Sequence, residues 1–281
     1  MKGNKLNCIL WILIAIFFLG VLIRGLTGKN WHNFRFWTWG WEPKVLDNKI
    51  HFNEKDFEEE SDFIPRDDYS VYTFSADDIS NLNINIVSEN FSISPVSASD
   101  EIKVLIQNNI DTRKYFKIYK NDNTLNIERK SNKKFNFHGL TRTEIIMQVP
   151  DILFTSASFD NVSGTTQIEN LKTRKLSVNN VSGKTEIKNC EGKIKTQNVS
   201  GKIQIQQNQL KNDIDAECVS GKIEIILPKN ADFTADYETV SGSVKTDFTK
   251  TGKKEGTISN GERTYDLYLE TVSGSIEVNA F

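Results

Sequence analysis

The chain has 281 residues, of which 26% are charged, and its formal net charge is −2. A net charge this close to zero excludes a strongly basic nucleic-acid-binding protein. The length is sufficient for one substantial hydrophobic core in addition to an N-terminal segment.

The first expected element is a membrane-spanning helix over residues 6–23, which follow a short tail over residues 1–5. This run contains no charged residue, and as a helix it is about 27 Å long, enough to cross the hydrocarbon core of a bilayer. No small-residue cleavage site follows it, so the pattern favours an uncleaved single-pass anchor over a cleaved signal peptide. Basic residues flank both ends in similar number, and the short tail favours an extracellular C-terminal domain.

Residues 24–66 are expected to form a juxtamembrane linker with an aromatic part and an acidic part. Four of the five tryptophans lie between Trp31 and Trp41. This segment fits a membrane interface, and a strand packed on the end of the following domain is the alternative. Between Glu54 and Asp62, six carboxylates stand against one lysine, which is typical of a solvated spacer.

Residues 67–281 are predicted to form one β-domain. Apolar and polar residues alternate in short runs, the pattern of a strand with one buried face. In the first half these runs are Leu82/Ile84/Ile86, Phe91/Ile93, Ile102/Val104/Ile106, Phe116/Ile118, Leu125/Ile127 and Ile145/Met147/Val149.

The second half of the domain is built on a repeated tripeptide, Val-Ser-Gly. It occurs six times, at intervals of 19, 18, 20, 21 and 32 residues, and a seventh copy is hidden in Cys190-Glu191-Gly192. After each glycine, the second and fourth residues are Ile, Val or Thr, so a half-buried strand begins there. Glycine accepts a positive φ at little cost, and the valine is expected to point inward. The predicted structural corners are Gly164, Gly183, Gly192, Gly201, Gly221, Gly242 and Gly274.

A second strand precedes each corner; Leu176 and Val178, for example, lead to Val181. One such unit cannot bury its own face, whereas stacked units share a core. The predicted fold is therefore all-β: a β-solenoid-like stack of strand–Ser-Gly corner–strand repeats, preceded by one transmembrane helix. A β-sandwich is the competing architecture. Val87-Ser88-Glu89-Asn90 resembles a degraded corner, and residues 250–263 are expected to form a loop.

Few residues are candidates for a site. No spacing of Ser, His, Cys or carboxylates matches a catalytic, metal or phosphate motif, so neither enzymatic activity nor a cofactor is expected. Cys190 and Cys218 are expected to face opposite sides of their strands and not to form a disulfide. The lysines that follow four of the glycines are candidates for a basic, ligand-facing stripe toward anionic wall polymers. The alternative is that they keep the strands soluble and guard edges. They are Lys184, Lys193, Lys202 and Lys222.

Three features carry a resemblance to a known family. They are the repeated Val-Ser-Gly-x-Ile-x-Ile, the segment from Leu227 to Gly242 and the segment from Glu270 to Ile276. The chain resembles the bacterial "putative adhesin" β-strand-repeat family, also called the toastrack domain, which includes LiaG-like membrane-anchored proteins. This resemblance implies a membrane-linked, non-enzymatic β-repeat domain, and it transfers no catalytic residue.

The expected function is that of a non-enzymatic module anchored in the cell membrane, acting in cell-envelope interaction, adhesion or envelope-stress response. Its partners would be membrane lipid, through the N-terminal helix, and envelope polymers or another membrane protein, but not nucleic acid. Two alternatives stay open. One is a β-helix enzyme acting on envelope glycans, and the other is a cytoplasm-facing partner of a membrane stress regulator.

Overall fold

The computed structural model of the protein describes residues 62–65, 68–107, 112–130 and 143–281. Its 17 strands belong to one hydrogen-bonded sheet, which confirms the all-β prediction, and α2 (Thr112–Tyr115) is a single short helical turn. The predicted helix over residues 6–23 lies outside the described residues. Within the described ranges, no helix is long and apolar enough to cross a membrane.

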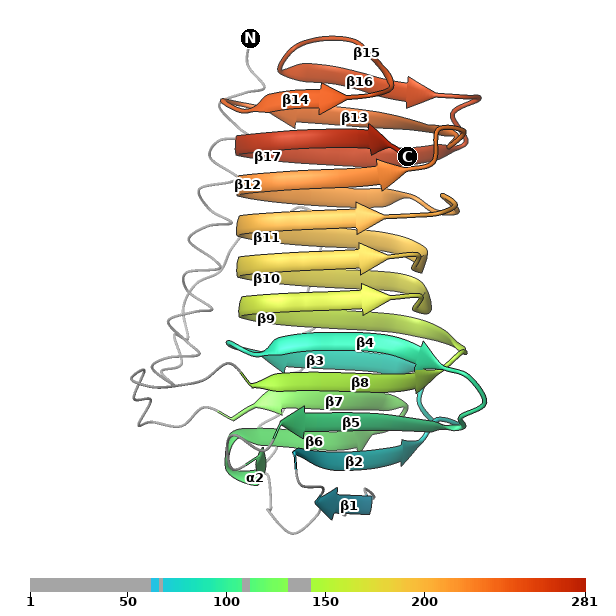
Figure 1. The fold of residues 1–281 in the computed structure, drawn as a ribbon, viewed down its shortest axis with the longest axis vertical. Coiled ribbons are helices and arrows are strands. Elements are labelled where there is room, and N and C mark those ends of the chain that lie inside the picture. Colours follow the sequence, from blue (N-terminus) through green and yellow to red (C-terminus); the bar gives the residue numbers. More distant parts are fainter. Residues whose placement is uncertain (1–61, 66–67, 108–111, 131–142) are drawn as a thin grey trace.

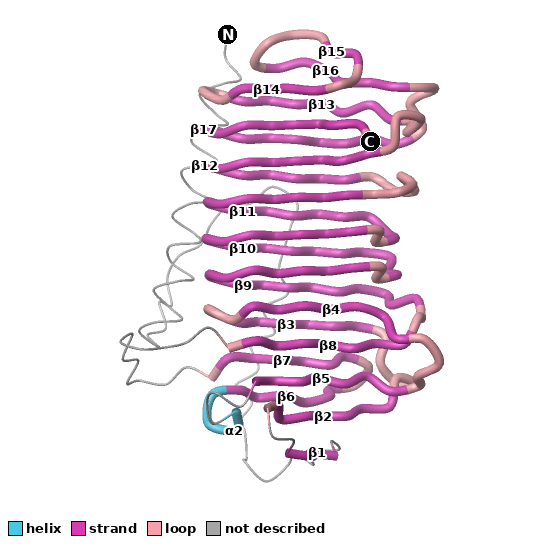
Figure 2. The backbone as a smooth tube through the Cα atoms, viewed as in Figure 1, coloured by secondary structure: helices cyan, strands magenta, loops and turns pink. Residues whose placement is uncertain are grey.

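The centre of the molecule is a stack of five long strands, each of which forms one rung. Each strand runs along one layer, turns at its Val-Ser-Gly corner and returns along the other layer (Figures 1 and 2). We call the layer before the corners layer A and the layer after them layer B. Because one strand supplies both layers, the architecture is a solenoid and not a sandwich. The rungs are β9 (Leu153–Glu169), β10 (Lys172–Lys188), β11 (Glu191–Gln206), β12 (Ile214–Leu227) and β17 (Tyr265–Ala280).

At the N-terminal end of the stack, chain order and stack order differ. β3 (Asn81–Ile86) and β4 (Asn90–Val96) form the rung beside β9, and β7 (Thr124–Arg129) and β8 (Glu144–Pro150) form the next one. Antiparallel strands close this end. They are β6 (Phe116–Asn121) on β7, β5 (Glu101–Gln107) on β8, β2 (Tyr69–Ser75) on β5 and β1 (Asp62–Pro65) on β2. β1 lies within the stretch expected to be linker, so the sheet begins before residue 67.

The C-terminal end also departs from chain order. β17 lies between β12 and the pair β13 (Phe233–Thr239) and β14 (Ser243–Thr246). β16 (Glu255–Asn260) pairs with β13 and β15 (Thr249–Lys250) pairs with β16, both antiparallel. The predicted loop over residues 250–263 is therefore wrong over β16, whereas residues 251–254 and 261–263 are loop, as predicted. β16 has a single buried side chain, that of Ile258, which lies opposite Ala235 of β13. This edge strand therefore lacks the alternating apolar residues that indicate a strand in the sequence.

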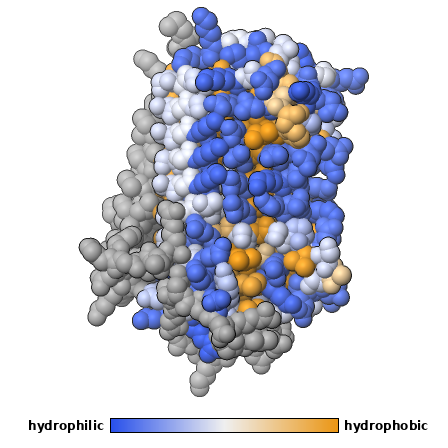
Figure 3. Space-filling model, viewed as in Figure 1, coloured by the Kyte–Doolittle hydropathy of each residue, from blue (hydrophilic) through white to orange (hydrophobic). Residues whose placement is uncertain are grey.

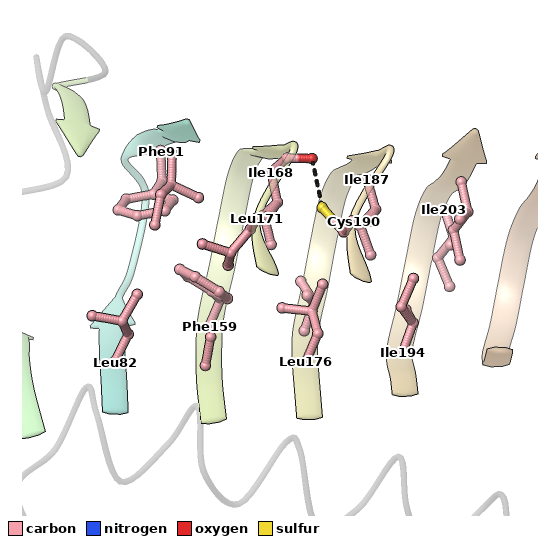
Figure 4. Packing of buried hydrophobic residues seen from close by; sticks show 14 of the residues in the cluster. Leu82, Phe91, Phe159, Ile168, Leu171, Leu176, Ile187, Cys190, Ile194 and Ile203 are labelled. Atoms are coloured by element: carbon pink, nitrogen blue, oxygen red, sulfur yellow. Dashed lines mark hydrogen bonds between the residues drawn. The ribbon is translucent and has the colours of Figure 1, made fainter. Parts of the chain in front are cut away.

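The hydrophobic core lies between the two layers. In β10, Leu176 and Val178 of layer A and Ile187 of layer B are fully buried. Figure 4 shows side chains of successive rungs, among them Phe159, Leu176 and Ile194, lying side by side along the stack. Since the rungs are parallel and in register, similar side chains form continuous columns, which is how a repeat stack buries its core.

The residue that points inward at each corner differs from the prediction. Asn180 is 1% exposed, whereas Val181 is only half-buried, so the expectation of an inward valine is wrong. The physical reason is the period of the strand, since position 180 is the next inward position after Leu176 and Val178. The equivalent buried residues in the other rungs are Asn161, Asn198, Cys218, Thr271 and Thr239.

The corner glycines of the Val-Ser-Gly motifs form one column along the stack. At Gly201, φ is +109° and a Cβ would collide with the carbonyl oxygen of Gly183. At Gly221 a Cβ would collide in the same way with Gly201, although its φ is not in the left-handed region. The close approach between neighbouring rungs is thus the reason why both corners require glycine. Gly192 lies at the opposite edge, where a Cβ would meet Thr173, so the seventh copy is a second corner of β11 and not a separate rung.

Candidate interaction surfaces

Three of the four lysines predicted to form a stripe come together on the outer face of layer B. Lys184, Lys202 and Lys222 occupy the same position on β10, β11 and β12, one residue after the corner glycine. Lys193 lies instead on layer A, in register with Lys175, because Gly192 belongs to the opposite edge. The structure therefore contains a stripe of three lysines.

Each lysine of this stripe has a carboxylate partner in the neighbouring row. Lys202 Nζ lies 2.7 Å from Glu224 Oε2, and Lys222 Nζ lies 2.8 Å from Glu224 Oε1 and 2.7 Å from Glu277 Oε2. Lys184 pairs with Glu186. Although burial opposes it, the hydrogen bonds from Lys202 and Lys222 hold the pKa of Glu224 below its usual value. This face is hydrophilic over most of its area (Figure 3), and its stripe carries paired charges.

Near the N-terminal end of the stack, the outer face of layer A consists mainly of amide and hydroxyl side chains. Asn83 Nδ2 donates a hydrogen bond to Asn126 Oδ1 at 2.9 Å, so β3 and β7 are linked across their outer side chains. Asn179 Nδ2 donates to Asp160 Oδ1 at 2.7 Å, which links β10 and β9. Burial raises the pKa of Asp160 despite the hydrogen bond from Asn179. These side chains largely bind one another.

Toward the C-terminal end, the outer face of layer A becomes acidic. Glu217, Glu270 and Glu238 lie directly in register on β12, β17 and β13, and Glu255 of β16 stands opposite Glu238. We call these four residues, together with the adjacent row of Asp215, Tyr268 and Asp236, the acidic face. The ring of Tyr268 lies in the middle of it and is 50% exposed.

Lys195 of β11 borders the acidic face. Its Nζ lies 2.9 Å from Asp215 Oδ2 and 3.3 Å from Glu217 Oε1. Burial raises the pKa of Glu217, with a smaller contribution from Asp215, and this outweighs the opposing effect of Lys195. Neighbouring strands lie about 4.8 Å apart, so in-register carboxylates concentrate negative charge on this part of layer A. A locally negative surface of this kind attracts cationic groups.

The acidic face was missed at the level of the sequence because its members are far apart along the chain. A signal was present, however. Glu217, Glu238 and Glu270 each stand two residues before the valine of a Val-Ser-Gly motif. Once the motifs are aligned in register, these glutamates form a row.

The remaining candidates do not form a chemical site. Cys190 and Cys218 are free, as expected, but both are buried in the core, so the expectation that they face opposite sides of their strands is wrong. Burial raises their pKa values to about 12 and about 11. In the part of the chain that the structure describes, no group of three or more His, Cys, Asp or Glu residues is arranged to hold a metal ion.

The rungs from β9 to β17 can be compared with known proteins. The family model Toastrack DUF4097 matches residues 151–279. These residues belong to the toastrack family. No protein with a curated description matches the sequence.

Solved structures resemble this toastrack domain and its N-terminal extension. A putative cell adhesion protein from Clostridium sporogenes is 16% identical with a TM-score of 0.51, over 76% of this chain and 99% of its own. A putative adhesin from Bacteroides fragilis is 14% identical with a TM-score of 0.34, over 76% and 98% of the two chains. The first likeness shows a shared fold, and the second is too distant to show one.

Proposed function

We propose that the protein is a non-enzymatic interaction module of the bacterial cell envelope. The apolar run over residues 6–23 anchors it in the cell membrane, and the toastrack domain lies outside the cell. The observation that best supports this is the acidic face, because an in-register row of carboxylates across neighbouring strands suits an extended partner better than a small substrate. Small substrates are normally held in concave, largely apolar pockets. The Clostridium sporogenes structure is that of a putative cell adhesion protein, and this supports the proposal by analogy of fold alone.

The chemistry of the acidic face indicates its partner. Carboxylates on β12, β17 and β13 attract cationic groups, such as amino groups on an envelope polymer or a basic segment of another membrane protein. The lysines of the stripe on layer B are paired with carboxylates of the same face. To bind an anionic polymer, Lys202 and Lys222 would have to exchange their contacts with Glu224 and Glu277.

The orientation of the domain is tested by cysteine labelling in intact bacterial cells. Lys253 is exposed, so Lys253→Cys in the full-length chain places a thiol at the surface, whereas Cys190 and Cys218 are buried. A membrane-impermeant maleimide is expected to label this variant before the cells are opened, with the wild-type chain as the control. Labelling only after lysis would show that the domain faces the cytoplasm.

The role of the acidic face is tested with charge-neutral variants of the full-length protein. We expect Glu217→Gln, Glu238→Gln and Glu270→Gln together to weaken binding to isolated cell envelopes, and to weaken its dependence on salt concentration. Glu186→Gln, Glu224→Gln and Glu277→Gln on layer B remove the same charge and serve as the matched control. Equal binding by the two triple variants would contradict the proposal.

A further inference from the structure

The outer face of layer A carries lysines next to the acidic face. Lys175 of β10 and Lys193 of β11 are in register, and both side chains are exposed. Neither lysine forms an ion pair with a described residue. Lys195 lies in the next row of β11, in register with Asp215. We call the three lysines the basic patch.

Carboxylates continue the rows of the basic patch on the next two strands. Because Ile194 is in register with Ile214, Asp213 stands beside Lys193 at the start of layer A. Asp266 of β17 follows, and its backbone N–H donates to Asp213 Oδ1 at 3.2 Å. The Asp266 side chain is exposed and forms no ion pair with a described residue. The face therefore changes from basic to acidic between β11 and β12, which are neighbours in the stack (Figure 1).

We propose that this face binds a second copy of the chain, with the two stacks antiparallel. The two-fold axis lies in the interface and runs along the strand direction, between β11 and β12. Such an axis places β11 opposite β12 of the other copy and β10 opposite β17, and each contact occurs twice. The basic part of each copy thus faces the acidic part of the other.

The axis sets every lysine of the basic patch opposite an aspartate of the other copy. Rotation about the strand direction exchanges strands and keeps each row opposite the same row. Facing sheets lie about 10 Å apart, a distance that lysine and aspartate side chains span together. The facing pairs are Lys193 with Asp213, Lys175 with Asp266 and Lys195 with Asp215.

The row nearer the corners is also complementary at its centre. Gln197 faces Glu217 and Asn179 faces Glu270, so amide groups that can donate hydrogen bonds meet carboxylates. One pair of like charge, Asp160 of β9 with Glu238 of β13, lies farther from the axis.

Charge and area both favour this arrangement. A two-fold axis along the stack would instead set the acidic strands opposite each other, which electrostatic complementarity disfavours. The strands of layer A from β3 to β16 span about 38 Å and six residues of each span about 20 Å. The resulting area of about 760 Å² per copy is close to the roughly 800 Å² that a stable interface buries on each partner.

The test uses the purified full-length protein in detergent, with molar mass measured by light scattering over a range of protein concentrations. We expect the wild-type chain to reach the mass of two copies, and added salt to favour the single copy. No envelope material is present, so the result does not depend on the proposed function. The dimer covers Glu217 and Glu270, so it would compete with an envelope partner for the acidic face.

Two charge reversals and their combination identify the surface. Lys175→Glu and Asp266→Lys should each give the mass of one copy, because like charges then face each other. Lys175→Glu/Asp266→Lys should restore the mass of two copies. Within one chain these positions are separated by β11 and β12, about 14 Å, so an ion pair inside the chain does not explain the recovery. Lys253→Glu changes the same charge at an exposed residue of the β15–β16 hairpin and should leave the dimer intact.

Three results would overturn the proposal. The first is a wild-type chain that keeps the mass of one copy at every concentration. The second is a dimer that persists in both single reversals, which would assign the contact to another part of the chain. The third is a double variant that stays single although circular dichroism shows that its β-structure is retained.

Discussion

At the scale of single residues, the corner depends on close contact between neighbouring rungs. We predict that Gly201→Ala destabilises the domain by about 2–4 kcal/mol, because the added Cβ meets the Gly183 carbonyl and the backbone has a positive φ. Thermal unfolding followed by circular dichroism measures this. Ser200→Ala, at the preceding residue, is the control and should change stability by less than about 1 kcal/mol. A similar midpoint of thermal unfolding for both variants would show that neighbouring rungs can move apart to accommodate the added Cβ.

The pKa values of Glu217 and Glu224 are shifted in opposite directions, so replacing each glutamate by glutamine should change the stability of the fold in opposite directions at pH 7. Burial raises the pKa of Glu217, so its ionised form disfavours the folded state above the ordinary glutamate pKa of about 4.3. Glu217→Gln should therefore raise stability at pH 7, and the gain should vanish at about pH 3. The pKa of Glu224 is lowered by its lysine partners, so Glu224→Gln should lower stability at pH 7. This loss should also vanish as the pH falls through the lowered pKa. Urea unfolding at both pH values compares the two variants, and a shift of the same sign in both would contradict the assigned environments.

At the scale of a single strand, β11 shows that the two faces of a rung contribute unequally. Ile203 is fully buried, whereas Lys202 lies on the outer face and pairs with Glu224. We predict a loss of about 2–5 kcal/mol for Ile203→Ala and of less than about 1 kcal/mol for Lys202→Ala. Urea unfolding of the two variants gives the comparison. A larger loss for the lysine variant would mean that the outer ion pairs carry the stability.

The alternation of residues allowed most strands to be predicted from the sequence. The runs through Leu82, Ile102 and Ile145 are strands with buried apolar faces, as expected. The position of a strand in the stack could not be predicted, because it depends on which edge each strand meets in space. The acidic face was missed for the same reason, since it exists only once β12, β17 and β13 are neighbours.

The inward asparagines show a second limit of sequence reasoning. Asn161, Asn180 and Asn198 directly precede the Val-Ser of their corners, and asparagine is common in turns. In the structure they are buried, and Asn161 Nδ2 donates a hydrogen bond to Glu89 O at 3.1 Å. At Asn161 the corner thus brings a backbone carbonyl inside, and a hydrophobicity pattern does not indicate such a polar position.

At the scale of the whole molecule, β17 holds the C-terminal end together. It pairs with β12 on one side and with β13 and β14 on the other. We predict that removing residues 265–281 abolishes the order of β13–β16 as well. Hydrogen exchange measured by mass spectrometry should show loss of protection over residues 233–260, while residues 153–206 stay protected. Retained protection over residues 233–260 would show that β13 can pair with β12 directly.

The position of β17 also has a consequence for biosynthesis. A ribosome makes β13, β14 and the β15–β16 hairpin before it makes the strand on which β13 and β14 pack. β13 and β14 must wait for that strand, so the C-terminal end of the stack cannot form in the order of translation. Closure of the C-terminal end therefore requires synthesis of β17, because a chain interrupted before this strand leaves one edge of β12 and one edge of β13 uncovered and open to cellular proteases.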